Sequence, residues 1–183
     1  SGDPVVSIDR AAHTVKAKSG RQVSYDKLLI ATGSDPFIIP VPGKDLPGVV
    51  TFRDLDDVDK MLAAADLGGN AVVIGGGLLG LEAAHGLALR GMQVTVLHLM
   101  PTLMERQLDE AAGWLLKSEL ERRGQTILTG ADTAEIVGNG KVEAVRLKDG
   151  TEIKADIVVM AVGIRPSTGL AKEAGLAVGR GIQ

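Results

Sequence analysis

The residues best suited to chemistry in this chain of 183 residues are three glycines in the pattern Gly75-x-Gly77-x-x-Gly80. An apolar run, residues 71–74, precedes the pattern, and a segment of helical character, residues 78–90, follows it. In such a unit the first glycine permits a tight turn, the second lets the backbone approach a pyrophosphate, and the third lets the helix pack closely on the strand. The pyrophosphate of a dinucleotide would then lie against the free N–H groups at the start of the helix.

The second strand of this unit ends at His98, 23 residues after Gly75. This position usually carries Asp or Glu, which accepts hydrogen bonds from the adenosine ribose, or has a cation nearby for a 2′-phosphate. Histidine is neither a firm acceptor nor a firm cation at neutral pH. We interpret His98 as a neighbour of the ribose, and Arg106 either as an exposed residue or as an aid to a 2′-phosphate. The choice between NADH and NADPH stays open, with a lean toward NADH.

Other polar residues near the glycine pattern have ordinary structural interpretations. Glu82 is either a carboxylate that the helix dipole favours or a residue near the nicotinamide end of the ligand. His85 and His13 are interpreted as surface or helix-face residues. The acidic run over residues 54–59 has the density of a metal site, but it is interpreted as a capped helix start with a solvated face. We therefore predict no metal site and no catalytic side chain.

A regular alternation of strands and helices positions these residues. The predicted strands cover residues 71–74, 94–97 and 126–128, and the predicted helices between them cover residues 78–90 and 109–123. This order predicts a parallel sheet with right-handed crossovers, which is a Rossmann-like α/β fold. An antiparallel β-meander over residues 135–154 and a buried strand over residues 157–161 are expected to follow, and then a short helix near residues 170–174.

Two of the predicted helices are expected to have an apolar side. The first is capped by Asp54, ends toward Gly68, and has its apolar positions at Leu55, Val58, Met61 and Leu62. The helix over residues 109–123 has its apolar positions at Leu108, Ala112, Leu115, Leu116 and Leu120.

Two segments 130 residues apart, residues 15–36 and 145–166, are versions of one another. Aligned without a gap, they share Val, Lys, Gly, Asp, Ala, Gly and Pro at matching positions. Each predicts a hairpin that turns at Lys-x-Gly, then a buried strand, then a Gly-x-x-Pro exit. In the first copy the strand is residues 28–31, an unbroken apolar run typical of a strand covered on both faces. Only the second copy follows a complete dinucleotide-binding unit, so we expect the chain to be a piece of something larger.

The composition excludes several classes of function. A net charge of −3 and 2% aromatic residues argue against a nucleic-acid surface. No apolar run approaches the length of a membrane span, and nothing resembles a signal peptide. Without cysteine, this stretch has no disulfide, no thiolate metal site and no thiol redox chemistry. A cytoplasmic location is the default expectation. The four prolines and two glycines of residues 36–48 predict an extended connection between domains.

Together these features resemble the two-dinucleotide-binding-domain flavoprotein reductases, the pyridine nucleotide-disulfide oxidoreductase superfamily. In that family an FAD domain is interrupted by an inserted NAD(P)H domain of the same fold. The chain crosses between the two domains through segments like residues 29–33 and 161–166 of this sequence. The resemblance implies that residues 1–45 are a remnant of the FAD domain and the crossover, residues 46–163 the NAD(P)H-binding domain, and residues 164–183 a return segment toward the FAD domain.

The same resemblance implies a set of binding residues. The pyrophosphate would be held by Gly75, Gly77, Leu79 and Gly80. Leu78 would also bind the cofactor, and Glu82 would lie by the nicotinamide. Ala161, Val162 and Gly163 would lie near the bound nicotinamide nucleotide, and Ala31, Thr32 and Gly33 at the junction with the flavin domain.

One segment is similar to a particular branch of the family. Residues 98–109, HLMPTLMERQLD, resemble the large subunit of the NAD(P)H-dependent assimilatory nitrite reductases, and residues 161–166 and 170–176 fit the same group. Most of the family carries Glu where this chain has His98, and this departure points to the same branch. In that branch the flavin domain passes electrons toward an iron–sulfur and siroheme centre.

The resemblance therefore implies a parent enzyme that passes hydride from NAD(P)H to FAD and reduces nitrite. The expected partners are a nicotinamide dinucleotide and the missing FAD domain, with neither nucleic acid nor membrane. Because no FAD phosphate loop is present, we predict that the chain alone is without FAD, is colourless and has no reductase activity. A ferredoxin or rubredoxin reductase and a non-enzymatic redox sensor remain the alternatives. A hydroxy-acid dehydrogenase domain is disfavoured because no acid/base candidate stands out beyond isolated histidines.

Overall fold

The computed structural model describes residues 2–183, which divide into two compact units. The larger unit runs from Pro36 to Gly163, and the smaller unit combines the residues up to Asp35 with those from Ile164 onward. The chain therefore passes from one unit to the other twice. The assignment of these parts to FAD and NAD(P)H domains stays a prediction.

The larger unit is built on a five-stranded sheet in which every neighbouring pair of strands is parallel. In spatial order the strands are β5 (Val49–Thr51), β12 (Ile157–Met160), β6 (Asn70–Ile74), β7 (Gln93–His98) and β8 (Thr126–Thr129). The predicted α/β fold with a parallel sheet is confirmed. Because all five strands run the same way, their carboxyl ends lie at one edge of the sheet.

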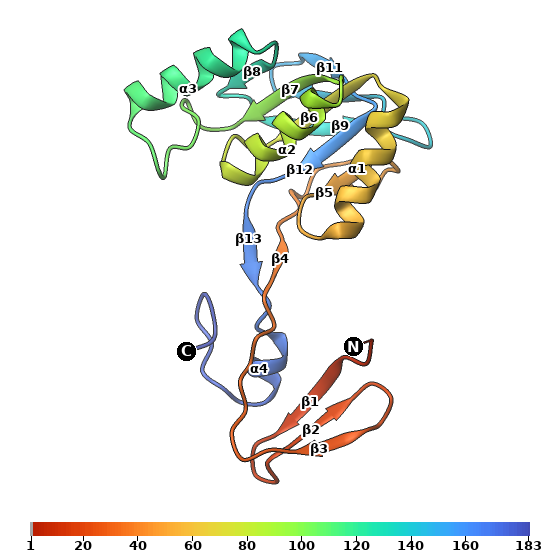
Figure 1. Ribbon diagram of the computed structural model, residues 1–183, viewed down its shortest axis with the longest axis vertical. Helices are drawn as coiled ribbons and strands as arrows, with labels where there is room; N and C mark the ends of the chain where they lie inside the picture. The colour runs from red at the N-terminus through yellow and green to blue at the C-terminus, as the bar shows by residue number, and fades with distance from the viewer. Residues whose placement is uncertain (1) are drawn as a thin grey trace. The chain divides into compact units, whose positions relative to one another are not determined.

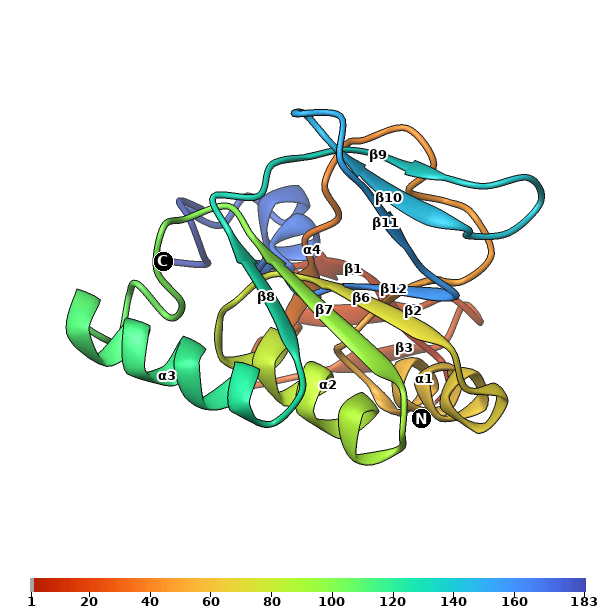
Figure 2. The same ribbon diagram turned by 90° about the horizontal axis from the view of Figure 1, so that it is seen from above.

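Helices cover one face of this sheet and an antiparallel meander covers the other (Figures 1 and 2). The helices are α1 (Leu55–Leu67), α2 (Leu78–Leu89) and α3 (Glu110–Arg122), and the meander consists of β9 (Thr133–Val137), β10 (Ala144–Leu147) and β11 (Glu152–Lys154). Carboxylates cap two of the helices: Asp54 accepts from the Asp57 amide at 3.0 Å and Asp109 from the Ala112 amide at 2.8 Å. Each such cap stabilises its helix by about 1 kcal/mol.

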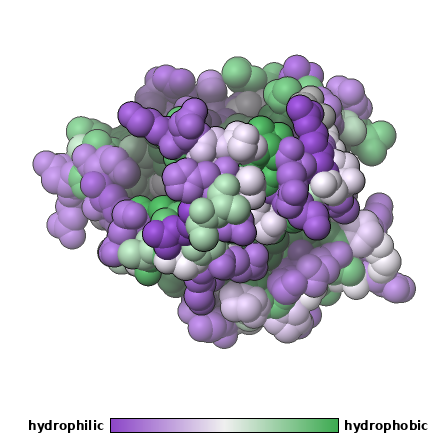
Figure 3. Space-filling model, turned by 90° about the horizontal axis from the view of Figure 1, so that it is seen from below, coloured by the Kyte–Doolittle hydropathy of each residue, from purple (hydrophilic) through white to green (hydrophobic). Residues whose placement is uncertain are grey.

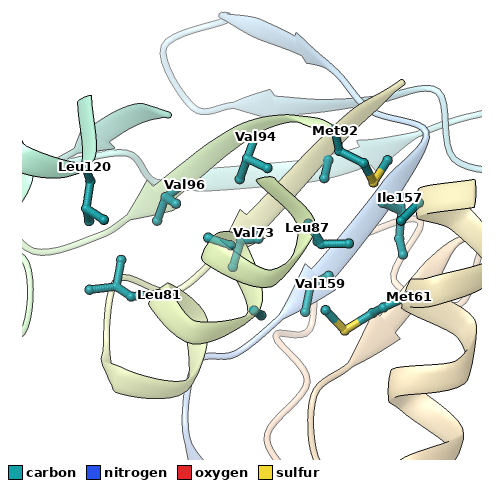
Figure 4. Close-up of a cluster of buried hydrophobic side chains, with 14 of the residues drawn as sticks. Met61, Val73, Leu81, Leu87, Met92, Val94, Val96, Leu120, Ile157 and Val159 are labelled. Carbon is teal, nitrogen blue, oxygen red and sulfur yellow. The ribbon is translucent and has the colours of Figure 1, made fainter. Parts of the chain in front are cut away.

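Successive strand residues point into two separate cores. Val73 of β6 packs with the helix side, and its neighbour Val72 packs with the meander side. Figure 4 shows the helix-side core, where Leu81 and Leu87 of α2 lie over the central strands. Since both faces are covered, these strands require unbroken apolar runs, which is why residues 71–74 and 157–160 carry no polar side chain. Burying each large side chain contributes roughly 1.5–3 kcal/mol.

The apolar sides predicted for α1 and α3 are partly wrong. Leu55 is 79% exposed and Leu115 is 62% exposed. The buried positions of α1 begin at Asp57, and those of α3 begin at Gly113. Leu55 lies two residues before Asp57, and Leu115 lies two residues after Gly113. Two residues correspond to about 200° around the helix axis, so both leucines face away from the sheet.

The smaller unit contains a three-stranded antiparallel sheet and one short helix. Its strands β1 (Val5–Asp9), β2 (Thr14–Ala17) and β3 (Gln22–Ser24) pair in chain order, and its helix is α4 (Gly169–Glu173). The guanidinium of Arg10 donates to the Gly175 carbonyl at 2.9 Å, which ties the turn after β1 to the end of α4. The strands β4 (Ser34–Pro36) and β13 (Ile164–Pro166) pair with each other where the chain passes between the units.

The predicted repeat is present as a repeated hairpin with the same register. Val15 pairs with Val23 in β2–β3, and Val145 pairs with Ile153 in β10–β11. The glycines in the turns of these two hairpins, Gly20 and Gly150, have φ values of 91° and 89°. The two exits are equivalent as well, since they are the paired strands β4 and β13.

The buried strand predicted in both copies exists in only one. The second copy forms β12, which lies between β5 and β6. In the first copy residues 28–31 form no strand, and Leu29 is 88% exposed, so this prediction is wrong. A strand needs a neighbour for its N–H and C=O groups, and no strand in the part of the chain that the structure describes pairs with this segment.

Asp156 links the starts of β12 and β6, and its role predicts a pH dependence. Its carboxylate accepts from the Asn70 amide at 2.8 Å, which lowers the pKa of Asp156 below its ordinary value. A lowered pKa in the folded state adds stability above the ordinary aspartate pKa, and this stability is lost as the pH falls through the lowered value. We therefore expect Asp156→Asn to lower the melting temperature at neutral pH.

Measuring melting temperatures from neutral to acidic pH checks this prediction. The difference between Asp156→Asn and the wild type is expected to shrink as the pH falls through the lowered pKa. Asp26→Asn, at the matching position of the first copy of the repeat, controls for the loss of one charge. A difference for Asp156→Asn that does not change with pH would contradict this role of the carboxylate.

Figure 3 shows one face of the molecule, on which hydrophilic side chains predominate and hydrophobic ones lie among them. Among residues 2–183, no helix is both long enough and apolar enough to cross a membrane.

Candidate dinucleotide-binding site

Most of the predicted binding residues meet at the carboxyl edge of the parallel sheet. Gly75 follows β6, His98 ends β7, and Ala161 follows β12. Backbone hydrogen bonds hold these ends together: the Gly75 amide donates to Leu97 O at 2.8 Å, and the Ala161 amide donates to Ile74 O at 2.9 Å. In open α/β sheets, this edge is where ligands bind.

The packing of the backbone explains two of the three glycines. Gly75 has a φ of +123°, and a Cβ atom there would collide with the carbonyl oxygen of Ala161. A Cβ atom at Gly80 would collide with the carbonyl oxygen of Gly75. These positions therefore form the tight turn and the close helix–strand contact that the pattern predicts.

Gly77 differs from the other two because the protein leaves the space beside it open. It is the N-cap of α2, and its backbone is extended with φ −86° and ψ −177°. Within residues 2–183, no heavy atom outside the two adjacent residues lies within 4 Å of the position a Cβ would take. The first turn of α2 carries no acidic side chain. The N–H groups of that turn have no acceptor within the helix, and the helix dipole makes this end favourable for an anion.

The residues around this open space are a mixture of apolar and polar groups. Leu78 and Leu79 are 58% and 40% exposed, and Glu82 is exposed on the second turn of α2. Gly163 is exposed, and its carbonyl oxygen accepts from the Phe37 amide at 2.9 Å. An exposed leucine pair at the start of a helix suits a ligand with both phosphates and flat rings.

His98 is buried and uses both of its ring nitrogens within the protein. Its Nδ1 accepts from the Gly76 amide at 3.0 Å, and its Nε2 lies 3.0 Å from Oε2 of Glu105. Because a backbone amide can only donate, Nδ1 carries no proton in this geometry, and the proton on Nε2 is donated to Glu105. The interpretation of His98 as a direct ribose neighbour stays a prediction.

Glu105 is a polar neighbour of the site that the sequence patterns did not single out. Its side chain is 28% exposed, and its Oε1 lies 3.8 Å from Nε of Arg106, which is 78% exposed. The signal available in the sequence was a carboxylate seven residues after the strand end, inside the segment HLMPTLMERQLD.

Ala31, Thr32 and Gly33 belong to the smaller unit, whereas the residues of the candidate site described so far belong to the larger one. The Thr32 hydroxyl donates to the Ser167 carbonyl at 2.6 Å, and the Ser167 amide donates to the Gly33 carbonyl at 3.0 Å. These contacts hold the paired strands β4 and β13 together. Contact of Ala31, Thr32 and Gly33 with a flavin stays a proposal.

The acidic run over residues 54–59 is explained by the start of α1. Asp54 caps the helix, and Asp57, which is buried, accepts from the Thr51 hydroxyl at 2.7 Å and from the Arg53 amide at 2.9 Å. In residues 2–183, no group of three or more His, Asp or Glu side chains is arranged to hold a metal ion.

Known proteins similar to this chain share both its sequence and its fold. It is 56% identical over 182 residues to a nitrite reductase [NAD(P)H] of Bacillus subtilis (strain 168), covering 100% of this chain and 23% of that protein. It is 46% identical to the assimilatory nitrate reductase electron transfer subunit of the same organism, covering 100% of this chain and 24% of that protein. The chain thus spans about a quarter of the length of these two relatives.

A solved structure gives the same result at the level of the fold. The crystal structure of a ferredoxin reductase from Rhodopseudomonas palustris matches with a TM-score of 0.94 and 32% identity, over 98% of this chain and 45% of that one. The family described as "Pyridine nucleotide-disulphide oxidoreductase" matches residues 1–183, so the resemblance predicted from the sequence is confirmed. Because the match includes the glycine loop and both repeated hairpins, this chain belongs to the pyridine nucleotide-disulphide oxidoreductase family.

Proposed function

We propose that this chain is the NAD(P)H-binding portion of an FAD-dependent electron-transfer reductase, and that the larger unit holds the dinucleotide. The observation that carries the proposal is the open N-terminus of α2 at Gly77, placed beside the strand ends at Gly75 and Ala161. The amides of the first turn of α2 would bind the pyrophosphate. Leu79 and Gly163 would flank the ligand, and Glu82 would lie toward its nicotinamide end.

In this proposal NAD(P)H is the substrate that donates hydride. The chain supplies binding and orientation: the open N-cap accepts the phosphates, and the exposed leucines cover an apolar part of the ligand. No side chain is required to move a proton, because hydride transfer belongs to the nicotinamide itself.

In this proposal the phosphates of FAD are bound by residues outside this chain. The sequence contains one Gly-x-Gly-x-x-Gly pattern, and it lies in the larger unit with the proposed NAD(P)H site. Thr32 and Gly33, which resemble the flavin-domain junction, hydrogen-bond to Ser167 beside the paired strands β4 and β13. Flavin binding and reduction of a final acceptor are therefore proposed for the longer protein and not for these 183 residues.

For the final acceptor we favour nitrite. This choice is supported by the 56% identity to a nitrite reductase [NAD(P)H] over the whole chain. Siroheme and an iron–sulfur centre would then lie in the part of the longer protein outside this chain. The second candidate is an electron-transfer subunit of assimilatory nitrate reduction, supported by the 46% identity to that relative. An assay of the full-length protein distinguishes the two candidates. Reduction of nitrite with NADH supports the first, and transfer of electrons from NADH to a separate subunit supports the second.

Calorimetric titration of the 183-residue chain with NADH, and in parallel with NADPH, tests the binding proposal. We expect saturable heat with NADH and weaker binding of NADPH. A clear preference for NADPH would overturn the lean toward NADH, and the absence of heat with both would contradict dinucleotide binding by this chain.

A further inference from the structure

His98, the last residue of β7, and the segment that follows it hold Gly76 from both sides. The Gly76 amide donates to Nδ1 of His98 at 3.0 Å, and the Gly76 carbonyl accepts from the Met104 amide at 3.0 Å. Leu103, between these contacts, is fully buried, and a Cβ atom at Gly76 would run into Leu103 and the His98 ring. The position of Glu105, the next residue after Met104, is therefore determined by the glycine loop itself.

The side chain of Glu105 is oriented by His98. With Nδ1 occupied by the Gly76 amide, the ring donates from Nε2 to Oε2 of Glu105 at 3.0 Å. This leaves Oε1 as the carboxylate oxygen that points to other partners, with Nε of Arg106 at 3.8 Å. A carboxylate that is partly buried and held by a charge-assisted hydrogen bond is well positioned to accept further hydrogen bonds.

Through His98, this arrangement brings a carboxylate to the strand end at which the Rossmann fold usually carries an acidic residue. At the end of the second strand, an acidic side chain ordinarily accepts the hydrogen bonds of the adenosine ribose. Here His98 occupies that strand end, and its acceptor nitrogen Nδ1 is used by the amide of Gly76. We propose that Glu105, positioned by His98, accepts the hydrogen bonds of the adenosine ribose hydroxyls and selects NADH against NADPH.

The selection follows from charge and from hydrogen bonding together. The 2′- and 3′-hydroxyls of NADH donate to a carboxylate, whereas the 2′-phosphate of NADPH is anionic and is repelled by it. Arg106 is a cation beside this carboxylate, and its 3.8 Å contact with Glu105 offsets the attraction it would offer a phosphate. The inference rests on the proposed function, because it requires that the chain binds a dinucleotide at this edge.

The test is a titration of the 183-residue chain and of Glu105→Gln with NADH and NADPH. Glutamine keeps an oxygen that accepts from His98 but removes the charge. We expect NADH to bind about tenfold more weakly, as for loss of one hydrogen bond to a charged group, and the preference for NADH over NADPH to fall by at least as much. The matched control is Glu143→Gln, an exposed glutamate just before β10, for which the preference is expected to be unchanged.

A rescue variant tests the positioning role of His98. In the double variant His98→Glu with Glu105→Gln, an acid at the strand end accepts from the Gly76 amide and from the ribose directly, so the preference for NADH is expected to return. If His98 and Glu105 only stabilised the glycine loop, this double variant would not restore the preference for NADH. Melting temperatures of all variants establish that each is folded.

The possible results separate the role of Glu105 from dinucleotide binding itself. If the wild type binds neither dinucleotide, the proposed function fails, and the role of Glu105 fails with it. If the wild type binds NADH but Glu105→Gln retains the wild-type preference, or weakens NADH and NADPH equally, the inference is overturned. Failure of the double variant to regain preference for NADH also counts against it.

Discussion

Replacing Gly77 with aspartate is expected to abolish NADH binding without reducing the stability of the fold. The extended backbone at Gly77 is one that any residue adopts, and no protein atom would contact the new Cβ atom. Aspartate is a better N-cap than glycine by a few tenths of a kcal/mol, so α2 is expected to be slightly more stable. Binding and stability should therefore change in opposite directions.

The loss of binding follows from the chemistry of the helix end. The new carboxylate would accept from the amides of the first turn of α2 and would repel the pyrophosphate from the same place. Losing two hydrogen bonds to a charged group, each worth about 1.5–3 kcal/mol, weakens binding by at least about a hundredfold. Calorimetric titration with NADH, together with urea unfolding of the same preparations, measures both quantities.

Gly77→Ser is the matched control because serine is also a good N-cap but carries no charge. It is expected to keep the stability and to weaken NADH binding less than aspartate does. Wild-type affinity in Gly77→Asp would show that the N-terminus of α2 is not the pyrophosphate site. A stability loss as large as the loss of binding would mean that the substitution acts through the fold.

Replacing Gly80 with alanine is expected to destabilise the protein by roughly 1–3 kcal/mol, the usual cost of overpacking a well-packed site. The new Cβ atom would collide with the carbonyl oxygen of Gly75, and backbone cannot move aside as a flexible side chain can. Within a helix, alanine is otherwise favoured over glycine by about 1 kcal/mol. The close contact between α2 and the turn after β6 must therefore outweigh a favourable change in helix propensity.

The same helix offers a control of opposite sign. Gly86 is exposed in α2, and apart from the backbone of its own helix and its two chain neighbours, no described heavy atom lies within 4 Å of the position a Cβ would take. Gly86→Ala is expected to stabilise the protein by up to about 1 kcal/mol. Urea unfolding followed by circular dichroism compares the two variants, and equal shifts in the same direction would refute the packing role of Gly80.

The strand and helix pattern of the larger unit could be predicted because its signals are local. Residues 71–74 and 157–160 are unbroken apolar runs, and Asp54 and Asp109 precede helical segments as capping residues. Hydrogen bonds within a helix and the side-chain alternation of a strand depend on near neighbours in the chain. The glycine pattern was recognised in the same way, because its spacing, the strand before it and the helix after it are all local in the sequence.

The errors arose where burial depends on distant parts of the molecule. Residues 28–31 are as apolar as residues 158–161, yet only the second segment includes a strand with neighbours on both sides. Leu115 is as apolar as Leu120, but only Leu120 faces the sheet. Apolar character shows that a residue is suited to burial, and the assembled sheet decides which residues are covered.

The candidate site likewise combines features that the sequence predicts with contacts that only the tertiary structure creates. Gly75, Gly77 and Gly80 could be recognised from their spacing between a strand and a helix. The partnership of His98 with Gly76 and Glu105 could not be inferred from composition or periodicity. It exists because the segment after β7 turns back onto a loop that is distant in the chain, and hydrogen bonds form between groups that folding brings within about 3 Å.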